Sequence, residues 1–364
     1  MAAATPAAPT ANRALQLCVK TPLVFSPSLR VYLKMESTQP SGSFKIRGIG
    51  HIASKLASEA ASKGIQAHLV SSSGGNAGLA ATHAARALGL GCTIFVPVTA
   101  KPHVLDKLRA DGGKVVVGGN HWAEADAAAR EFVEKTEGAI YIHPFDHPLV
   151  FEGHSGMMSE VIEQMAELQA GKPAAVVCSV GGGGLISGVF TGLKAVAPDV
   201  HVVACETNGA ASFLASLRSS HSSDPPSVKL ARLDKIDSIA STLGAVQVAE
   251  TSVKLALEHR GGVSSVTMSD AKAIDAAKQF QPCAAALVPL YSPSTLRTLF
   301  PSLSFVPNSP PAADSPAIVV IVCGGSTMTL EDFVGYEREF ERVERGEVRV
   351  FRGGRERVDE EVGA

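Results

Sequence analysis

One lysine in this sequence stands where its amine could act as a nucleophile. Within Ser41–Gly48, Lys45 lies between Phe44 and an apolar residue, after a Ser/Gly run that lets the backbone turn sharply. A free lysine titrates near about 10.4, so at neutral pH its amine is protonated. Partial burial beside a ring favours the neutral amine, which can form a Schiff base with an aldehyde. The alternative is a basic surface loop before a helix, which we expect over residues 50–63.

Four consecutive glycines, residues 181–184, follow an apolar strand-like run and precede a helix that we expect to begin at Leu185. The first amides of a helix lack partners within it, and the helix dipole is positive at that end. Glycine removes the side chains, so these amides can close around a phosphate group. The run does not match the usual nucleotide-binding spacings. A dinucleotide site nevertheless stays open, because Glu206 follows at the distance of a ribose-binding acid.

Two other segments follow strand-like runs and carry groups suited to a ligand. In Ser72–Gly78 the hydroxyls and amides could hold a carboxylate, and Asn76 could donate to a ring oxygen; the alternative is an ordinary helix cap. Cys323 ends the last apolar run, at the edge where open parallel sheets bind ligands. Its neutral thiol could face a pyridine nitrogen without protonating it, or it could be a small buried residue.

The elements that would position these residues alternate between strand and helix along the chain. Apolar runs such as residues 67–71, 174–180 and 317–322 are typical of strands that are buried on both faces. The alternation predicts an α/β fold with parallel sheets and helices on both faces. We expect Ser216–Ser227, rich in Ser, Asp and Pro, to be an exposed loop, and residues 292–316 to be an irregular connection.

Bulk composition narrows the class of protein. The length of 364 residues suits about two domains, and 45% hydrophobic with 19% charged residues is typical of a globular protein with a large core. A net charge of −2 gives no reason to expect nucleic acid or an anionic membrane as a partner. No apolar run reaches the roughly 18 to 20 residues of a membrane helix. Six scattered cysteines without a Cys-x-x-Cys pair favour reduced thiols in a cytoplasmic protein.

Four segments together resemble a known family. Ser41–Gly48, Ser72–Gly78, Gly181–Leu185 and Cys323–Gly325 occur in the order and approximate spacing of the serine/threonine dehydratases, and the likeness covers about residues 14–330. These are pyridoxal-phosphate enzymes with the tryptophan-synthase-β-like fold. The resemblance therefore implies two open parallel-sheet domains of the fold-type II kind, and a homodimer. The chain looks most like the L-serine dehydratase branch, because no regulatory domain follows the catalytic part.

The resemblance implies a role for each matching residue. Lys45 would form the Schiff base, Phe44 would lie against the pyridine ring, and Asn76 would bond the ring hydroxyl. Cys323 would meet the ring nitrogen. The phosphate would be held by Gly181, Gly182, Gly183, Gly184 and Leu185. The carboxylate of a small amino-acid substrate would be surrounded by Ser73, Gly74, Gly75 and Ala77. A monovalent cation such as K⁺ would be bound by Glu206, the Ala210 carbonyl and Ser212.

The implied reaction is β-elimination of L-serine, or of L-threonine, to pyruvate or 2-oxobutanoate and ammonia. A serine racemase or threonine deaminase of the same fold would share the motifs. The expected domains are a disordered tail over residues 1–13, a large cofactor-binding domain over residues 14–49 and 151–330, a small domain over residues 50–150, and a charged C-terminal tail, a solvated helix or a frayed end, over residues 331–364.

One segment departs from the family pattern. Residues 280–287 read Phe-Gln-Pro-Cys-Ala-Ala-Ala-Leu, whereas the family has an apolar strand followed by Glu-Pro-Ala-Cys-Gly-Ala-Ala-Leu. Gln281 stands where Glu is expected, Ala284 replaces Gly, one residue is absent, and the strand before the motif, near Cys283, is missing. A catalytically impaired cofactor-binding protein is therefore the alternative to an active enzyme.

Overall fold

A computed structural model describes residues 17–27, 29–279, 299, 317–325, 327–340 and 348–359 of the chain. These residues form two compact units. The first contains Lys45–Pro144, Gln39–Ser41 and the described residues up to Val19. The second contains Lys20–Thr38, Gly42–Phe44 and the described residues from Phe145 onward. Within these ranges, every helix is too short or too polar to span a lipid bilayer.

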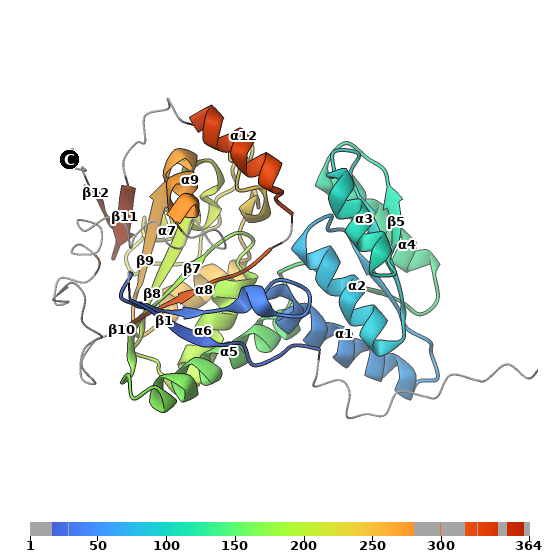
Figure 1. The fold of residues 1–364 in the computed structure, drawn as a ribbon, viewed down its shortest axis with the longest axis horizontal. Coiled ribbons are helices and arrows are strands. Elements are labelled where there is room, and N and C mark those ends of the chain that lie inside the picture. Colours follow the sequence, from blue (N-terminus) through green and yellow to red (C-terminus); the bar gives the residue numbers. More distant parts are fainter. Residues whose placement is uncertain are drawn as a thin grey trace, which may run out of the picture. The chain divides into compact units, whose positions relative to one another are not determined.

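A four-stranded parallel sheet forms the centre of the first unit (Figure 1). Its strands lie in the order β5-β4-β3-β6, with the bounds β3 (His68–Ser71), β4 (Gly91–Val96), β5 (Lys114–Val117) and β6 (Ala139–Tyr141). The helices of this unit are α1 (Lys45–Ser62), α2 (Asn76–Leu88), α3 (Pro102–Ala110) and α4 (Trp122–Lys135). Small apolar side chains pack α4 onto the sheet, where Ala125 and Ala129 join Val70 and Phe95 in one buried cluster.

An eight-stranded mixed sheet forms the centre of the second unit, in the order β1-β2-β10-β7-β8-β9-β11-β12 (Figure 1). The run from β2 to β9 is parallel, whereas β1, β11 and β12 pair in antiparallel fashion at the two edges. The bounds are β1 (Leu23–Ser26), β2 (Val31–Lys34), β7 (Pro173–Ser179), β8 (His201–Thr207), β9 (Val263–Met268), β10 (Ala317–Ile321), β11 (Val348–Arg352) and β12 (Arg355–Asp359).

Helices cover both faces of this larger sheet. They are α5 (Pro148–Glu167), α6 (Gly184–Val196), α7 (Ser212–Ser220), α8 (Glu250–Glu258), α9 (Asp270–Gln279) and α12 (Leu330–Phe340). One core cluster combines strand residues with Met157 of α5, Phe190 of α6 and Phe213 of α7. A second combines other strand residues with Ala276 of α9. Every residue of β8 and β10 is buried, because both faces of these strands are covered. The predicted α/β fold class is therefore confirmed.

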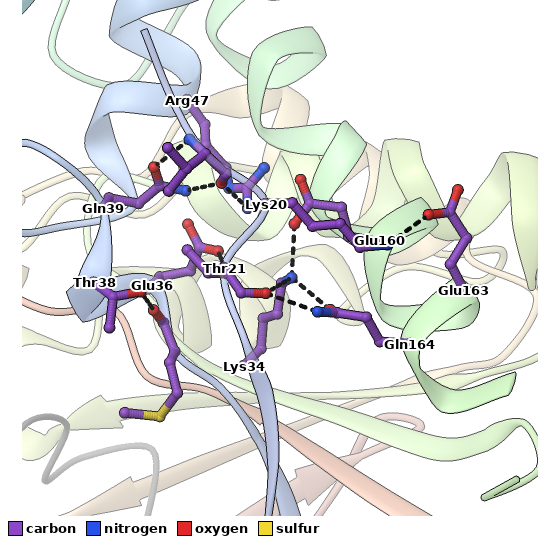
Figure 2. A network of polar contacts seen from close by, with 12 residues as sticks. Lys20, Thr21, Lys34, Glu36, Thr38, Gln39, Arg47, Glu160, Glu163 and Gln164 are labelled. Atoms are coloured by element: carbon purple, nitrogen blue, oxygen red, sulfur yellow. Dashed lines mark hydrogen bonds and ion pairs between the residues drawn. The ribbon is translucent and has the colours of Figure 1, made fainter. Parts of the chain in front are cut away.

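A buried ion pair joins β2 to α5 (Figure 2). Lys34 is the last residue of β2, and its side chain is fully buried. Its Nζ donates to Glu160 Oε2 at 2.6 Å, to Gln164 Oε1 at 2.8 Å and to the carbonyl oxygen of Thr21 at 2.8 Å. A buried ammonium group needs such partners, because without them the loss of hydration would be uncompensated. The network thus fixes the start of the second unit against α5.

Three segments differ from what the sequence predicted. α1 begins at Lys45, so the lysine expected on a loop is the first residue of a helix. Ser216 and Ser220 belong to α7 and not to an exposed loop; each hydroxyl donates to the carbonyl four residues earlier at 2.8 Å, so both polar side chains are satisfied while buried in the helix. The charged C-terminal segment forms α12, in line with the solvated helix that was one of its two expected states, but it also contains the unexpected hairpin β11–β12, whose Val348 and Val350 enter the core.

Candidate active site

Lys45 begins α1, and its side chain is half-buried in the first unit. Its Nζ donates to the carbonyl oxygen of Pro144 at 2.7 Å. The preceding residue, Phe44, belongs to the second unit, where its amide donates to the carbonyl oxygen of Cys323 at 3.0 Å. The ring of Phe44 packs against His154 with 5.1 Å between ring centroids. The backbone that leads into the lysine is therefore held in place by the end of β10.

The glycine run follows β7 and forms the N-terminus of α6. Gly183 has a φ of +94°, which side chains disfavour, and a Cβ there would lie less than 3.0 Å from Ser252 Oγ. A Cβ on Gly182 would overlap the ring of Phe145. Among the described residues, none accepts a hydrogen bond from the amides of residues 181–185. A tight turn with unpaired amides at a helix N-terminus is the arrangement that binds a phosphate.

Helix α8 and the residue before it form hydrogen bonds with the carbonyl groups of the glycine run. Ser252 Oγ donates to the carbonyl oxygen of Gly183 at 3.0 Å and lies 2.8 Å from Ser187 Oγ, and both serines are fully buried. The amide of Ala249 donates to the carbonyl oxygen of Gly182 at 3.0 Å. Because these two loop carbonyls are occupied by α8, the polar groups that the loop offers to a ligand are its N–H groups. Sequence spacing gives no signal for Ser252, which lies 69 residues from Gly183.

Cys323 lies beside the end of the strand that leads into the glycine run. It follows β10, which pairs with β7. Its Sγ lies 3.4 Å from the hydroxyl of Ser179, the last residue of β7, and the residue is only 6% exposed. Cys323 and the glycine run therefore lie at the carboxyl ends of adjacent parallel strands, which is where sheets of this kind bind ligands.

The segment from residue 72 to residue 78 joins the carboxyl end of β3 to α2 in the first unit, and α2 begins at Asn76. Gly75 is the residue before the helix, and its amide donates to Ser73 Oγ at 3.3 Å. A Cβ on Gly78 would overlap the carbonyl oxygen of Ser73, so the loop folds tightly onto the first helical turn. The amides of such a turn favour an anion.

Glu206 is fully buried in β8, and its two carboxylate oxygens accept hydrogen bonds from the amides of Phe213 and Leu214, each at 2.9 Å. Burial raises the pKa of Glu206 to about 8, and the two hydrogen bonds oppose this rise only in part. Ser212 Oγ is buried and has no hydrogen-bond partner among the described residues. Ala210 is buried at the end of the short helix before it. This part of the unit thus holds a buried carboxylate and an orphaned hydroxyl that a cation would satisfy.

Clusters of conventional metal-binding side chains are absent from the described ranges. No group of three or more His, Cys, Asp or Glu side chains is placed there to hold a metal ion. The polar groups near Glu206 are of another kind, since they include one buried carboxylate and one buried hydroxyl. Oxygen ligands suit hard cations better than they suit soft transition metals.

Comparison with known proteins identifies the family. Residues 15–324 match the family described as "Pyridoxal-phosphate dependent enzyme". The chain belongs to this family. The resemblance drawn from the four motifs is therefore confirmed, and pyridoxal phosphate is the cofactor of the family. The residues present fit that cofactor, because the chain offers a lysine amine, a thiol at a strand end and a glycine cradle whose amides lack acceptors in the described structure.

Several similar proteins align with most of the chain. The human "L-serine dehydratase/L-threonine deaminase" is 41% identical over an alignment of 338 positions, and the match covers 86% of this chain and 93% of that protein. An "L-serine dehydratase" of Saccharomyces cerevisiae (strain AWRI1631) is 37% identical over 83% of this chain and 90% of that protein. Among solved structures, "a fungal L-serine ammonia-lyase from Rhizomucor miehei" is 34% identical with a TM-score of 0.75, covering 89% of this chain and 99% of that one.

Maize serine racemase shares the fold, with a TM-score of 0.71 at 24% identity over 90% of this chain and 94% of that one. The roles inferred for individual residues stay predictions. The segment that departs from the family pattern, residues 280–287, lies outside the described residues.

Proposed function

We propose that this chain is a pyridoxal-phosphate-dependent enzyme that converts L-serine to pyruvate and ammonia, and L-threonine to 2-oxobutanoate and ammonia. The observation that carries the proposal is the 41% identity to the human L-serine dehydratase/L-threonine deaminase, which extends over 86% of this chain. The likeness to the fungal L-serine ammonia-lyase supports the same reaction class. The proposal requires a lysine, a phosphate cradle and a carboxylate-binding turn, and the chain has a candidate for each.

Several segments of the chain would supply the residues that hold the cofactor. In this proposal the amine of Lys45 would bind the aldehyde group, Phe44 would lie against the ring, Asn76 would bind the ring hydroxyl, and Cys323 would face the ring nitrogen. A neutral thiol would suit that nitrogen because it would leave the ring unprotonated. The phosphate would be held by the amides of Gly181, Gly182, Gly183, Gly184 and Leu185. When bound, the cofactor supplies an electron sink for the negative charge that develops at the substrate α-carbon.

The chain's own groups would then carry the substrate and its protons. The turn formed by Ser73, Gly74, Gly75 and Ala77 binds the substrate carboxylate, which leaves the α-hydrogen as the bond to be broken. The Nζ of Lys45, when free, would remove the α-proton as a general base. The leaving β-hydroxyl would take up one proton, which balances the one removed from the α-carbon, and would depart as water. The released 2-aminoacrylate takes up water and yields pyruvate and ammonia, so the atoms balance without an oxidant.

Four further features belong to the proposal. A K⁺ ion would be held by Glu206, the Ala210 carbonyl and Ser212, supported by the buried carboxylate and the orphaned hydroxyl. The first unit would be the small domain and the second the large cofactor-binding domain. The enzyme would act as a homodimer. A cytoplasmic location is supported by the five described cysteines, among which no disulfide forms.

The test uses the purified protein loaded with pyridoxal phosphate. Addition of L-serine should release pyruvate, measured with a lactate-dehydrogenase coupled assay, and L-threonine should release 2-oxobutanoate. Lys45→Ala should lose both the absorbance band of the lysine-bound cofactor and the activity. Formation of D-serine in place of pyruvate would assign the chain to the racemases. A normal wild-type cofactor band with no product from either amino acid would instead indicate the catalytically impaired protein.

A further inference from the structure

A partly buried carboxylate in the first unit connects two segments that the proposed chemistry needs. Asp126 lies on α4, and its side chain is 13% exposed. One of its oxygens, Oδ1, accepts hydrogen bonds from Ser72 Oγ at 2.6 Å and from the Tyr141 hydroxyl. The other, Oδ2, accepts from Arg130 Nε at 2.8 Å. The hydroxyls of Ser72 and Tyr141 also lie 3.0 Å apart, so all four groups form one cluster.

Each hydroxyl in this cluster belongs to a different functional segment. Ser72 directly precedes Ser73, where the candidate carboxylate-binding turn begins. Tyr141 ends β6, and the chain continues from it to Pro144, whose carbonyl oxygen accepts the hydrogen bond from Lys45 Nζ at 2.7 Å. Asp126 is thus one acceptor shared by the two segments.

The backbone alone does not fix the carboxylate turn. Up to Ser71 the chain is held by the ladder of β3 and by the bond from Ser71 Oγ to the Ile142 carbonyl oxygen at 3.2 Å. After Ser71 the strand pairing ends, and α2 begins only at Asn76. Between Ser71 and Asn76, the hydrogen bond from Ser72 to Asp126 is the first side-chain contact with another element, the helix α4. Its strength follows from the charge of the acceptor, because hydrogen bonds to ionised groups are the stronger ones.

The ionised state of the carboxylate is maintained by its surroundings. Burial alone would raise the pKa of Asp126, but the hydrogen bonds from Ser72, Tyr141 and Arg130 outweigh it and hold the pKa below its usual value. The Arg130 guanidinium also lies over the Tyr141 ring, 4.3 Å from its centroid. The packing of α4 does not require this carboxylate, since small apolar residues such as Ala125 and Ala129 already attach the helix to the sheet.

We propose that Asp126 is a positioning residue that sets the substrate-carboxylate turn through Ser72 and the carbonyl partner of Lys45 through Tyr141. The inference rests on the proposed function, since it needs an amino-acid carboxylate to be bound by residues 73–77. Asp126 itself touches neither substrate nor cofactor. Its loss should therefore weaken the binding of L-serine while leaving the cofactor-binding loop of the second unit intact.

The decisive variant is Ser72→Ala, which removes the tie to the turn and leaves Asp126 bonded to its other two partners. Its KM for L-serine should rise about tenfold, the size expected for one hydrogen bond to a charged group, with little change in kcat. Asp126→Asn should act in the same direction. The control is Glu131→Gln, on the same helix, which removes an exposed ion pair with Lys135 and should leave KM unchanged.

A second readout does not depend on turnover. Hydrogen exchange followed by mass spectrometry should show faster exchange in peptides covering residues 72–78 in Ser72→Ala than in the wild type and in Glu131→Gln. A wild-type KM together with wild-type exchange in Ser72→Ala would overturn the inference. If the wild-type protein released no product from L-serine, the proposed function would fail, and the exchange experiment would still decide whether Ser72 and Asp126 order the turn.

Discussion

Replacing Gly183 with alanine tests whether the glycine run holds the cofactor phosphate. The new side chain meets two separate obstacles. A φ of +94° is unfavourable for any residue with a Cβ, by about 1 to 2 kcal/mol. The added Cβ also lies less than 3.0 Å from Ser252 Oγ, and overpacking in a tight site costs about 1 to 3 kcal/mol. Ser252 cannot move aside without losing its bonds to the Gly183 carbonyl and to Ser187.

The total strain of about 2 to 5 kcal/mol must appear in one of two measurements. If the loop of the free protein keeps its shape, the strain lowers the free energy of unfolding. If the loop relaxes, the free energy of unfolding of the free protein stays unchanged. The binding of pyridoxal phosphate must then restore the strained loop, which lowers the affinity for the cofactor. Each 1.4 kcal/mol transferred in this way weakens the cofactor about tenfold. Urea denaturation of the apoprotein and a cofactor titration together measure both parts.

The matched control is Gly156→Ala on the exposed face of α5, where an added Cβ meets nothing within 4 Å. Removing a glycine from a helix interior should stabilise the protein by about 0.5 to 1 kcal/mol and leave cofactor affinity unchanged. The reasoning is refuted if Gly183→Ala shows wild-type stability and wild-type cofactor affinity. A loss of stability alone, with unchanged affinity, would show a rigid loop but would give no support for the phosphate role.

Three further outcomes follow from the contacts described. Lys34→Met should lower the free energy of unfolding by about 3 to 5 kcal/mol in urea titrations, because it removes the fully buried ammonium group that balances the charge of Glu160, whose side chain is only 17% exposed. Lys20→Met breaks a pair whose side chains are 44% and 62% exposed, and it should leave the free energy of unfolding nearly unchanged. The pKa of Asp126 is lowered on folding, so the ionised carboxylate stabilises the folded protein fully above the unfolded pKa near 3.8, and this stabilisation is lost as pH falls through the folded pKa. The difference in urea midpoint between the wild type and Asp126→Asn should therefore shrink below about pH 4. In K⁺-free buffer Ser212→Ala should be neutral or stabilising, since it removes an orphaned buried hydroxyl. If the proposed site binds K⁺, the ion should raise the Tm of the wild type, and Ser212→Ala should reduce that rise.

Much of the framework could be predicted from the sequence because its signals are local. The run of apolar residues in β10 has no polar face, which predicts a strand buried on both sides. The structure also shows the predicted order of a strand, a glycine run over residues 181–184 and a helix. The short strands β1, β6 and β9 were missed, since segments of three to six residues with Ser, Thr or Tyr carry little periodicity.

The features that the sequence did not predict depend on contacts between residues that are far apart in the chain. Helix α1 begins at Lys45 because the backbone just before it is held by the Cys323 carbonyl, which no local pattern shows. Ser252 appears in the sequence as one polar residue on an ordinary amphipathic helix, and only the fold brings it against Gly183. The same holds for Asp126, which lies 54 residues from Ser72. A charged residue on a helix is usually solvated, and the sequence alone offers no reason to expect otherwise here.

The central claim is that Lys45 holds pyridoxal phosphate in an enzyme that eliminates water from L-serine. The most direct measurement is borohydride reduction of the cofactor-loaded protein, followed by peptide mass spectrometry. We predict a phosphopyridoxyl group on the peptide that contains Lys45, and none when L-serine is present in excess and pyruvate accumulates. Attachment to a different lysine, or no attachment at all, would contradict the account.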